Sequence, residues 1–465
     1  MIKDSKEIEN FIYHGKNGTQ RMRSVKREGQ QLELDLTKAL DKDEPLTEYL
    51  MEEICSPKNL NQAYKQVKAN KGAAGVDGMT VQELGGYISQ HKETLIKSLL
   101  DGGYKPQEVR AVEIPKPNGG IRQLGIPTVV DRLIQQAIVQ ILQPIFDPTF
   151  SDSSFGFRPN RSAHQALKQA QTYVQDGRDI SVDLDLEKFF DRVNHDVLMS
   201  RVARRIKDKR LLRIIRRFLA AGIMKQGVCV ERYKGMPQGG NLSPLLSNLL
   251  LDELDKELEK RGHKFCRFAD DCNIYVNSQK AGERVMGSVR KFLETKLRLK
   301  LNEKKSKVAK VEECKFLGFK LLNDGHIAIA KESIKIFKDK IRKITKRNRG
   351  MKLEEIVRQL NIVLVGWVGY FRLADEYPSQ LGSLDGWIRR KLRCYRLKQR
   401  KKRWPIAKFL IESGVSQRNA WNIAKSGKGW WRLSATSELH RALNKAWFEK
   451  FGLVSLQNRS IKLNA

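Results

Sequence analysis

The chain has 465 residues, with 88 Lys and Arg against 53 Asp and Glu, which gives a formal net charge of +35 at pH 7. This length allows about two to four domains, and so large a positive charge indicates a polyanionic partner. The longest apolar run, at residues 362–371, is too short to span a bilayer, and the polar N-terminus predicts no secretory signal. We therefore expect no membrane partner and a cytoplasmic protein that binds nucleic acid.

The positive charge and the tryptophans are concentrated in the C-terminal third. Residues 331–465 hold 32 Lys and Arg against 10 Asp and Glu, and they contain all seven tryptophans. The six cysteines include no Cys-x-x-Cys pair, so the sequence supports neither a zinc knuckle nor a disulfide framework. We expect a reduced protein in which a basic, aromatic-rich module follows a more nearly neutral one.

Residues 1–44 are polar and weakly periodic, and we expect a flexible or partly helical arm there. The first clear strand signal lies at residues 112–126, where two apolar runs flank a Pro-Asn-Gly-Gly turn and predict a hairpin. Lys116 and Arg122 flank this turn, so both cations could reach one anion such as a triphosphate. Charges that protect a solvated hairpin edge are the alternative interpretation.

Thr128 predicts the start of a helix over residues 129–145. The following loop, at residues 155–161, places Arg158 and Arg161 among phenylalanines. Arginines beside aromatic rings suit phosphate contact and base stacking, although the aromatic residues could equally belong to the core.

Residues 180–186 alternate apolar and acidic side chains, which predicts a strand that carries Asp183 and Asp185 on one face. A buried strand with two aspartates at its C-terminal end conflicts with burial rules unless the charge is compensated. A metal ion shared with other carboxylates would compensate it. Capping of the helical segment that follows is the alternative.

The segment before the next long helix contains two glycines, at residues 239 and 240, which let the backbone lie close to a ligand. Ser243 and Pro244 predict the N-cap and the first position of that helix. The prediction is a strong helix that begins directly after a ligand-contacting turn.

Residues 264–276 predict a second hairpin, with Asp270 and Asp271 in its turn. Neighbouring residues on a regular strand point to opposite faces, so both carboxylates can serve one site only within the turn. They repel each other unless a cation neutralises them, and Mg²⁺ suits this role because it binds one or two carboxylates together with phosphates. An ordinary solvated turn is the alternative.

The C-terminal third is predicted to be helical, with amphipathic segments at residues 331–349, 353–371 and 384–398. Four consecutive cations then form a linker or an exposed basic face. A small terminal domain follows and contains Lys428. The four cations are Arg400, Lys401, Lys402 and Arg403.

Taken together, eight short blocks resemble the reverse transcriptases that bacterial group II introns encode, the intron maturases. Each block alone is a weak signal, but eight of them in the family's order are specific, and the resemblance covers roughly residues 46–460. The blocks lie at residues 75–78, 114–117, 156–162, 185–190, 237–244, 269–271, 305–306 and 317–318.

The resemblance implies an α+β fold of the right-hand polymerase type, with fingers, a palm built on a mainly antiparallel sheet, a helical thumb and a small helical DNA-binding domain. It leaves open whether the protein is a monomer or a dimer. The implied parts are an N-terminal arm (1–44), fingers (45–178), palm (179–330), thumb with the maturase function (331–400) and DNA-binding domain (401–465).

The resemblance also assigns the catalytic residues. Asp185, Asp270 and Asp271 would bind two Mg²⁺ ions, for which Mn²⁺ can substitute, and deoxynucleoside triphosphates would be the substrates. The residues implied to contact nucleic acid are Arg158, Arg161, Gly318, Arg400, Lys401, Lys402, Arg403 and Lys428.

The nucleotide site is implied in the same way. Phe190 would exclude nucleotides that carry a 2′-hydroxyl, and Gln238 would contact the nucleotide sugar. Lys116 and Arg122 would contact its phosphates. Lys305 would protonate the leaving pyrophosphate, although its lysine neighbours are equally basic.

Two features depart from the family's pattern. Phe268 stands where most members have tyrosine, so a hydroxyl near the primer end is missing while no metal ligand is lost. The zinc-dependent H-N-H nuclease with which many members end is not found after residue 456. The sequence therefore resembles the nuclease-lacking lineage called class C, which is thought to use existing DNA ends as primers.

The expected function is RNA-directed DNA synthesis that copies intron RNA into DNA during retrohoming, combined with binding of intron RNA to assist splicing. The expected partners are group II intron RNA, an RNA template, and a DNA target and primer, in the bacterial cytoplasm and at the nucleoid. A host-recruited reverse transcriptase for defence or repair is one alternative. A splicing factor that no longer polymerises is another.

Overall fold

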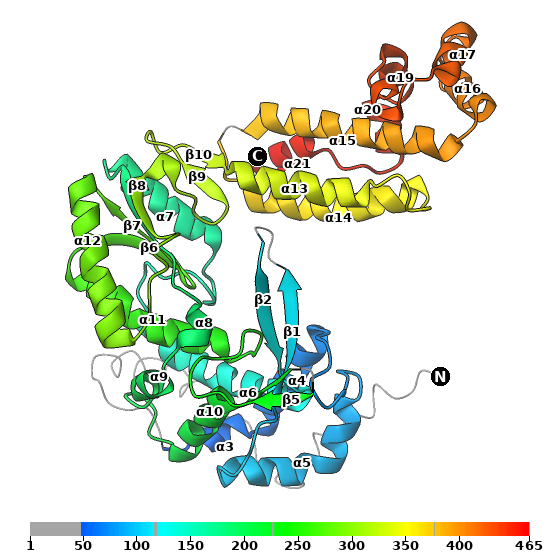
Figure 1. The fold of residues 1–465 in the computed structure, drawn as a ribbon. Coiled ribbons are helices and arrows are strands. Elements are labelled where there is room, and N and C mark those ends of the chain that lie inside the picture. The colour runs from blue at the N-terminus through cyan, green and yellow to red at the C-terminus, as the bar shows by residue number, and fades with distance from the viewer. Residues whose placement is uncertain (1–47, 116–118, 226, 376, 465) are drawn as a thin grey trace, which may run out of the picture. The chain divides into compact units, whose positions relative to one another are not determined.

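The computed structural model describes residues 48–115, 119–225, 227–375 and 377–464, so the predicted arm at residues 1–44 lies outside the described residues. The chain divides into two compact units. The first combines residues up to 170 with 180–309, and the second combines 171–179 with 310–465. In the described residues the first unit mixes helices with two four-stranded sheets, whereas the second is helical apart from one small hairpin (Figure 1). The predicted α+β class is confirmed.

The central sheet of the first unit joins strands from distant parts of the chain in the order β6-β7-β3-β8. β6 (Lys264–Phe268) and β7 (Asp271–Val276) form the predicted antiparallel hairpin, and β7 also pairs antiparallel with β3 (Ile180–Leu184). β8 (Lys307–Lys310) completes the sheet. The strand predicted at residues 180–186 is confirmed, although it ends at residue 184.

Two helices pack against this sheet. α12 (Gln279–Phe292) packs on β3 and β7, and α11 (Ser243–Lys260) packs on β6. The predicted cap of α11 is wrong, because the Ser243 hydroxyl donates to the Pro237 carbonyl oxygen at 2.7 Å instead of capping the helix. This bond ties the start of α11 to the turn before it.

The second sheet of the first unit has the order β2-β1-β4-β5. β1 (Val109–Pro115) and β2 (Ile121–Ile126) form the predicted hairpin, which stands out from the helices beside it (Figure 1). As predicted, Thr128 caps the helix that follows β2, because its hydroxyl accepts from the Asp131 N–H at 3.1 Å. Short strands complete the sheet. They are β4 (Ile223–Lys225), which is parallel to β1, and β5 (Val228–Val230).

The remaining elements of the first unit are helical and surround one apolar core. They are α3 (Leu50–Ile54), α4 (Pro57–Ala69), α5 (Leu84–Leu100), α6 (Val129–Phe146), η2 (Asp147–Thr149), α7 (Ala163–Gln175), α8 (Phe189–Arg192), α9 (His195–Val202), α10 (Lys209–Ala220) and η3 (Leu293–Leu297), of which α7 extends into the second unit.

Three long helices dominate the second unit, namely α13 (Lys331–Ile344), α14 (Leu353–Phe371) and α15 (Tyr377–Arg400), with α21 (Leu456–Asn464) packed on α14 and α15 (Figure 1). α13 ends at Ile344, five residues earlier than predicted, and the side-chain Nη1 of Arg349 donates to the carbonyl oxygen of this last helical residue at 3.0 Å.

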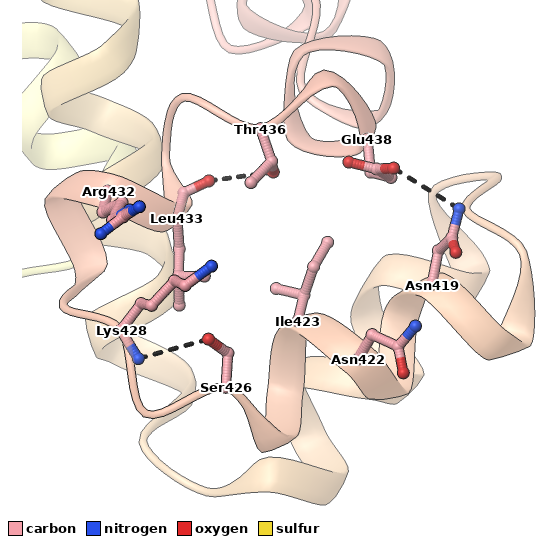
Figure 2. A pocket seen from close by; sticks show the side chains of 9 residues that line it. All are labelled: Asn419, Asn422, Ile423, Ser426, Lys428, Arg432, Leu433, Thr436 and Glu438. Atoms are coloured by element: carbon pink, nitrogen blue, oxygen red, sulfur yellow. Dashed lines mark hydrogen bonds between the residues drawn. The ribbon is translucent and has the colours of Figure 1, made fainter.

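Short helices beyond α15 line a cavity of about 260 Å³ that is open to solvent (Figure 2). The other elements of this unit are η4 (Val311–Glu313), β9 (Phe319–Leu321), β10 (Ile327–Ile329), α16 (Arg403–Glu412), α17 (Gln417–Lys425), α18 (Trp430–Leu433), α19 (Ser437–Ala442) and α20 (Lys445–Lys450). Across the described ranges, none of the helices combines the length and the apolar character that crossing a membrane requires.

Candidate active site

The β6–β7 hairpin carries Asp270 and Asp271 at its turn. Phe268, the last residue of β6, pairs with Asp271, the first residue of β7, so the turn consists of Ala269 and Asp270. The sequence placed both aspartates in the turn, whereas Asp271 belongs to the strand. Ala269 has a φ of +62°, which suits two-residue hairpins and is unfavourable for a residue with a side chain unless the surroundings fix it.

Strand pairing brings Asp185 to the same end of the sheet. Leu184 pairs with Cys272 in antiparallel register. The next residue of one strand, Asp185, therefore lies opposite the preceding residue of the other, Asp271. Asp185, Asp270 and Asp271 are all partly exposed, as carboxylates that meet a ligand must be.

A third part of the chain, residues 302–306, fixes Asp185. Asn302 Nδ2 donates to Asp185 Oδ1 at 3.0 Å, and Lys305 Nζ donates to Oδ2 at 3.3 Å. The Ser306 hydroxyl accepts from the Asp185 N–H at 3.0 Å, and the Asn302 N–H donates to the Asp185 carbonyl oxygen at 2.8 Å. Both the backbone and the carboxylate of Asp185 are thereby oriented.

A buried arginine supports the turn. The side chain of Arg267 in β6 is 1% exposed, and its Nη1 donates to the Ala269 carbonyl oxygen at 2.9 Å and to Asn248 Oδ1 at 3.0 Å. Its Nε and Nη2 donate to the two carboxylate oxygens of Asp255, and Nη2 also donates to the Ser154 hydroxyl at 2.7 Å. These bonds hold Ala269 in its left-handed conformation directly before Asp270.

Gly156 allows the preceding loop to lie against this turn. A Cβ at residue 156 would lie 2.2 Å from the Ala269 nitrogen, and the Gly156 carbonyl oxygen accepts from Asn248 Nδ2 at 2.8 Å. Neither Arg267 nor Asn248 was predicted from the sequence. The signal for Arg267 was a cation between the apolar residues Cys266 and Phe268 of a strand.

The carboxylate oxygens of Asp185, Asp270 and Asp271 are ligands of the kind that magnesium prefers. These three side chains alone do not provide a complete coordination shell. Among the described residues, no group of three or more His, Cys, Asp or Glu side chains has an arrangement that could hold a metal ion. Mg²⁺ needs only one or two carboxylates when substrate phosphates and water supply its other ligands. The neighbouring carboxylates of Asp185 and Asp271 match that requirement, with Asp270 adjacent in the turn.

Gln238 lies in a turn that is bonded to β2. Its carbonyl oxygen accepts from the Gly125 N–H at 2.9 Å, and its Oε1 accepts from Arg122 Nε at 2.7 Å. Gly239 has a φ of +124°, which favours glycine at this turn. Two predicted nucleotide-binding residues, Arg122 and Gln238, are therefore in direct contact, while Lys116 lies outside the described residues.

Phe190 contacts the segment that leads into this turn. Its side chain is buried, with its ring edge-on to Phe189 at 5.1 Å between centroids. Its carbonyl oxygen accepts from the Met236 N–H at 2.7 Å. Phe190 and Gln238 thus belong to adjacent segments. Asp185 precedes Phe190 by five residues in the chain.

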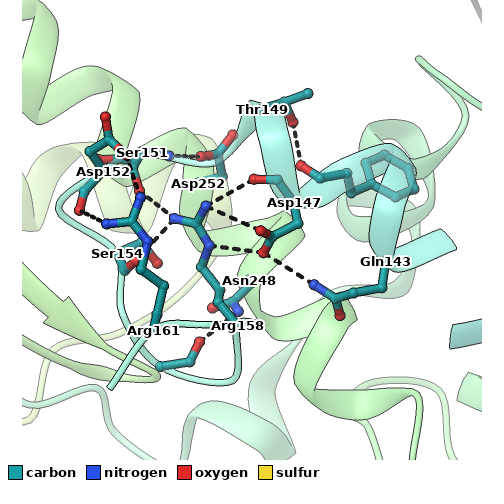
Figure 3. A network of polar contacts seen from close by, with 12 residues as sticks. Gln143, Asp147, Thr149, Ser151, Asp152, Ser154, Arg158, Arg161, Asn248 and Asp252 are labelled. Atoms are coloured by element: carbon teal, nitrogen blue, oxygen red, sulfur yellow. Dashed lines mark hydrogen bonds and ion pairs between the residues drawn. The ribbon is translucent and has the colours of Figure 1, made fainter. Parts of the chain in front are cut away.

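Arg158 and Arg161 make internal contacts (Figure 3). The Arg158 side chain is 4% exposed, and it donates to the Asp147 carboxylate and to the carbonyl oxygens of Ser151 and Ser154. These contacts favour a structural role for Arg158 over the predicted contact with nucleic acid. Arg161 pairs with Asp152 and remains 29% exposed, so it keeps donors for a ligand.

Gly318 belongs to the second unit. It has a φ of +82°, and its carbonyl oxygen accepts from the Ser333 hydroxyl at 2.8 Å. The neighbouring Leu317 carbonyl oxygen accepts from the Tyr370 hydroxyl at 2.8 Å. The segment that contains Gly318, which is predicted to contact nucleic acid, is thereby bonded to both α13 and α14.

The predicted basic contacts of the second unit differ in their surroundings. Arg400 places its guanidinium 4.6 Å from the centre of the Phe409 ring. The other four are exposed: Lys401, Lys402, Arg403 and Lys428. Lys428 also lines the cavity among α17, α18 and α19.

Two family models match the chain. Residues 114–321 match the model described as reverse transcriptase (RNA-dependent DNA polymerase), and residues 334–410 match the model described as group II intron, maturase-specific domain. The first range contains Asp185, Asp270, Asp271 and the residues that orient them.

Several curated proteins are similar in sequence. Protein YkfC of Escherichia coli (strain K12) is 34% identical over 325 residues, which are 61% of this chain and 84% of YkfC. Group II intron-encoded protein LtrA of Lactococcus lactis subsp. cremoris is 41% identical over 206 residues, 44% of this chain and 34% of LtrA. The putative COX1/OXI3 intron 1 protein of Saccharomyces cerevisiae is 33% identical over 198 residues, 42% of this chain and 24% of that protein.

Proposed function

Because this chain belongs to the family of reverse transcriptases and maturases that group II introns encode, we infer that it is an RNA-directed DNA polymerase that also assists the splicing of its intron RNA. The observation that carries the polymerase assignment is the strand register that sets Asp185 opposite Asp271 within the reverse transcriptase region. The biological reaction that we propose is the copying of intron RNA into DNA during retrohoming.

We assign the binding of divalent cations to Asp185, Asp270 and Asp271, with two Mg²⁺ as the physiological ions. When bound, such ions neutralise a triphosphate and lower the pKa of a primer 3′-hydroxyl, which favours in-line displacement of pyrophosphate. Asn302 orients the Asp185 carboxylate for this role. Its bond to Oδ1 restricts rotation of the Asp185 carboxylate. The carboxylate therefore loses less conformational freedom when the substrate binds.

Lys305 has a dual role in this proposal. Its ammonium lies 3.3 Å from Asp185 Oδ2, while its side chain is 63% exposed. The ammonium balances the carboxylate charge in this arrangement, and its flexible stem allows it to turn toward a bound triphosphate. There it would donate a proton to the leaving pyrophosphate.

The incoming nucleotide would contact the paired segments around β2. Arg122 and Lys116 would bind its phosphates, and Gln238 would contact its sugar. The bond from Arg122 Nε to Gln238 Oε1 links the residue that would bind phosphate to the residue that would contact the sugar. Phe190, held by the Met236 N–H at its backbone, would lie against the 2′ position of the sugar and exclude ribonucleotides.

The macromolecular partners that we propose are intron RNA, an RNA template, and a DNA primer and target at the nucleoid. The excess of Lys and Arg in residues 331–465 supports this proposal. Lys401, Lys402 and Arg403 are the exposed contacts, and Arg161 is a partly exposed one. Binding should weaken steeply with salt, by about 10³-fold or more between 50 and 200 mM if six or more phosphates are contacted.

Primer extension on an RNA template in the presence of Mg²⁺ tests this function. Asp185→Ala, Asp270→Ala and Asp271→Ala should each eliminate DNA synthesis and leave intron RNA binding intact. Asp101→Ala, which removes an exposed carboxylate at the end of α5, is the matched control and should extend the primer normally. Synthesis by the Asp185 variant would contradict the assignment, and an inactive wild-type protein that still assists splicing would establish a splicing factor instead.

A further inference from the structure

The cavity of the second unit has an apolar floor and polar walls. Its volume is about 260 Å³, which is below the roughly 300 to 1,000 Å³ of sites for drug-sized ligands, and it is open to solvent, so it suits a compact group that belongs to a longer ligand. Ile423 and Leu433, which are 7% and 4% exposed, supply the floor. A flat ring system could stack on these two side chains, so that one of its faces would be in apolar contact.

The two sides of the cavity carry different chemistry. Figure 2 shows the cations Lys428 and Arg432 on one side and the polar side chains Asn419, Asn422 and Glu438 on the other. The cationic side can bind phosphate oxygens. The polar side offers amide donors and acceptors together with a carboxylate, which accepts hydrogen bonds only.

Local contacts keep these walls in place. Asn419 and Asn422 lie on one face of α17, three residues apart, and Asn419 Nδ2 donates to Glu438 Oε1 at 3.4 Å. The Ser426 hydroxyl accepts from the Lys428 N–H at 3.2 Å, which fixes the loop that presents the lysine. Lys428 and Asn422 are both exposed residues.

We propose that this cavity receives one unstacked base of a single-stranded nucleic acid, with the neighbouring phosphates on Lys428 and Arg432. A base combines apolar faces with a polar edge and flanking anions, and proteins that hold an extruded base pack its faces against apolar side chains and read its edge by hydrogen bonds. The proposal rests on the inferred role of the chain as a nucleic-acid polymerase and adds a base-reading site outside the polymerase region.

The polar side predicts a preference among bases. Adenine and cytosine present exocyclic amino groups, which a carboxylate or an Asn side chain can accept, whereas thymine presents none. Glu438 should therefore favour a base with an amino group. An acidic peptide would match the cations of the cavity but would meet the carboxylate unfavourably.

Fluorescence anisotropy with the full chain tests the base preference. The probes are a labelled oligo-dT, the same strand with one central dC, and the same strand with one abasic site. The dC strand should bind about fivefold more tightly than either of the others. Glu438→Ala should abolish this difference, whereas Glu449→Ala, which removes a carboxylate of α20 outside the cavity, should preserve it.

The phosphate contacts are tested with the same probes. Lys428→Gln should weaken the binding of all three strands and reduce the salt dependence by about 0.7 released counterion per lost phosphate contact. Lys425→Gln removes an exposed cation of α17 that does not line the cavity and should have a smaller effect. The circular dichroism spectrum of each variant should match that of the wild type.

Three results would overturn the proposal: equal affinity for the three strands, a dC preference that survives Glu438→Ala, or equal losses from Lys428→Gln and Lys425→Gln. Competition by polyglutamate as strong as that by the dC strand would replace it with a nonspecific anion site. The control variants Glu449→Ala and Lys425→Gln should extend a short primer on an RNA template at the wild-type rate. If the wild-type chain does not extend that primer, the polymerase function fails and the binding result stands on its own.

Discussion

The guanidinium of Arg267 and the carboxylate of Asp255 form an ion pair that is closed to solvent, with Nη2 and Oδ2 2.5 Å apart and side-chain exposures of 1% and 0%. Burial raises the pKa of Asp255, and the guanidinium opposes that shift. The same guanidinium donates to the carbonyl oxygen of Ala269, one residue before Asp270. The ion pair therefore connects the core with the turn next to the carboxylates of Asp270 and Asp271.

Arg267→Met should lower the free energy of unfolding by about 3 to 5 kcal/mol, because it leaves Asp255 buried without a partner. The double variant Arg267→Met, Asp255→Leu should recover most of that loss, since an apolar pair can replace a buried ion pair. DNA synthesis should remain slow in the double variant, because Ala269 still lacks its donor. Denaturant unfolding and single-turnover primer extension give the two readouts. Normal synthesis by the double variant would assign Arg267 to stability alone.

Asn302→Ala should slow nucleotide incorporation by about 10- to 100-fold, in the range found when a residue that orients a metal ligand is removed. The lost bond is the one from Nδ2 to Asp185 Oδ1, so the maximal rate should fall more than the affinity for the nucleotide. Rapid-quench kinetics at several nucleotide concentrations separate the two effects. Asn277→Ala removes an exposed amide after β7 and should leave both unchanged.

Arg122 and Gln238 should act as a coupled pair in nucleotide binding. Arg122→Ala and Gln238→Ala should each raise the KM for the nucleotide, and the double variant should raise it by less than the two effects combined. The expected coupling energy is about 0.5 to 3 kcal/mol, as for residues in direct contact. The ion pair of Lys225 with Glu113 on the same sheet is the control cycle and should show no coupling in KM. Strict additivity for Arg122 and Gln238 would mean that their bond does not serve the nucleotide.

Phe190→Val should allow the incorporation of ribonucleotides, because a smaller side chain leaves space for the 2′-hydroxyl. Phe189→Val is a matched control, since Phe189 is also buried and its ring lies edge-on to that of Phe190. Both variants lose buried apolar volume and should be destabilised. Only the Phe190 variant should change the ratio of deoxyribonucleotide to ribonucleotide incorporation in primer extension. An unchanged ratio would place the sugar contact elsewhere.

His195 should make the fold sensitive to acid. Burial lowers the pKa of His195 from 6.5, and its Nε2 lies 2.6 Å from the Gly235 carbonyl oxygen. The unfolded chain therefore takes up the proton at a higher pH than the folded chain. The stability from this group is complete above about pH 6.5 and is lost as the pH falls below that value.

His195→Gln removes this proton uptake. The free energy of unfolding of the wild type should fall more than that of the variant between pH 7.5 and pH 5, as measured by denaturant titration. Parallel pH profiles for the two proteins would show that His195 does not titrate differently in the folded and unfolded states.

Local patterns in the sequence predicted much of the fold. The alternation in residues 180–186, the flanked turn in residues 264–276 and the cap at Thr128 each depend on a few neighbouring residues, and the structure confirms all three elements. The boundaries were less predictable. Ser243 was expected to cap α11, but the Pro237 carbonyl oxygen takes its hydroxyl, since a tertiary contact competes with the local one.

The family resemblance predicted the site residues, and the structure shows their surroundings. Arg158 illustrates the limit of local interpretation, because arginine beside aromatic residues suggested nucleic acid, whereas its donors are used by Asp147, Ser151 and Ser154 inside the fold. Burial and hydrogen-bond partners depend on residues that are distant in the chain. The sequence around Arg158 therefore contains no pattern that reveals its burial or its hydrogen-bond partners.

The amino-acid order alone established the reverse transcriptase and maturase assignment, the strongly basic C-terminal part, and the strands and turns that carry Asp185, Asp270 and Asp271. It could not establish that Asp185 lies opposite Asp271, that Asn302 and Lys305 hold Asp185, or that Arg267 fixes the turn. The former properties depend on short-range periodicity, turn chemistry and charge. The latter depend on strand register and on packing between segments up to 120 residues apart, which forms only when the whole unit folds.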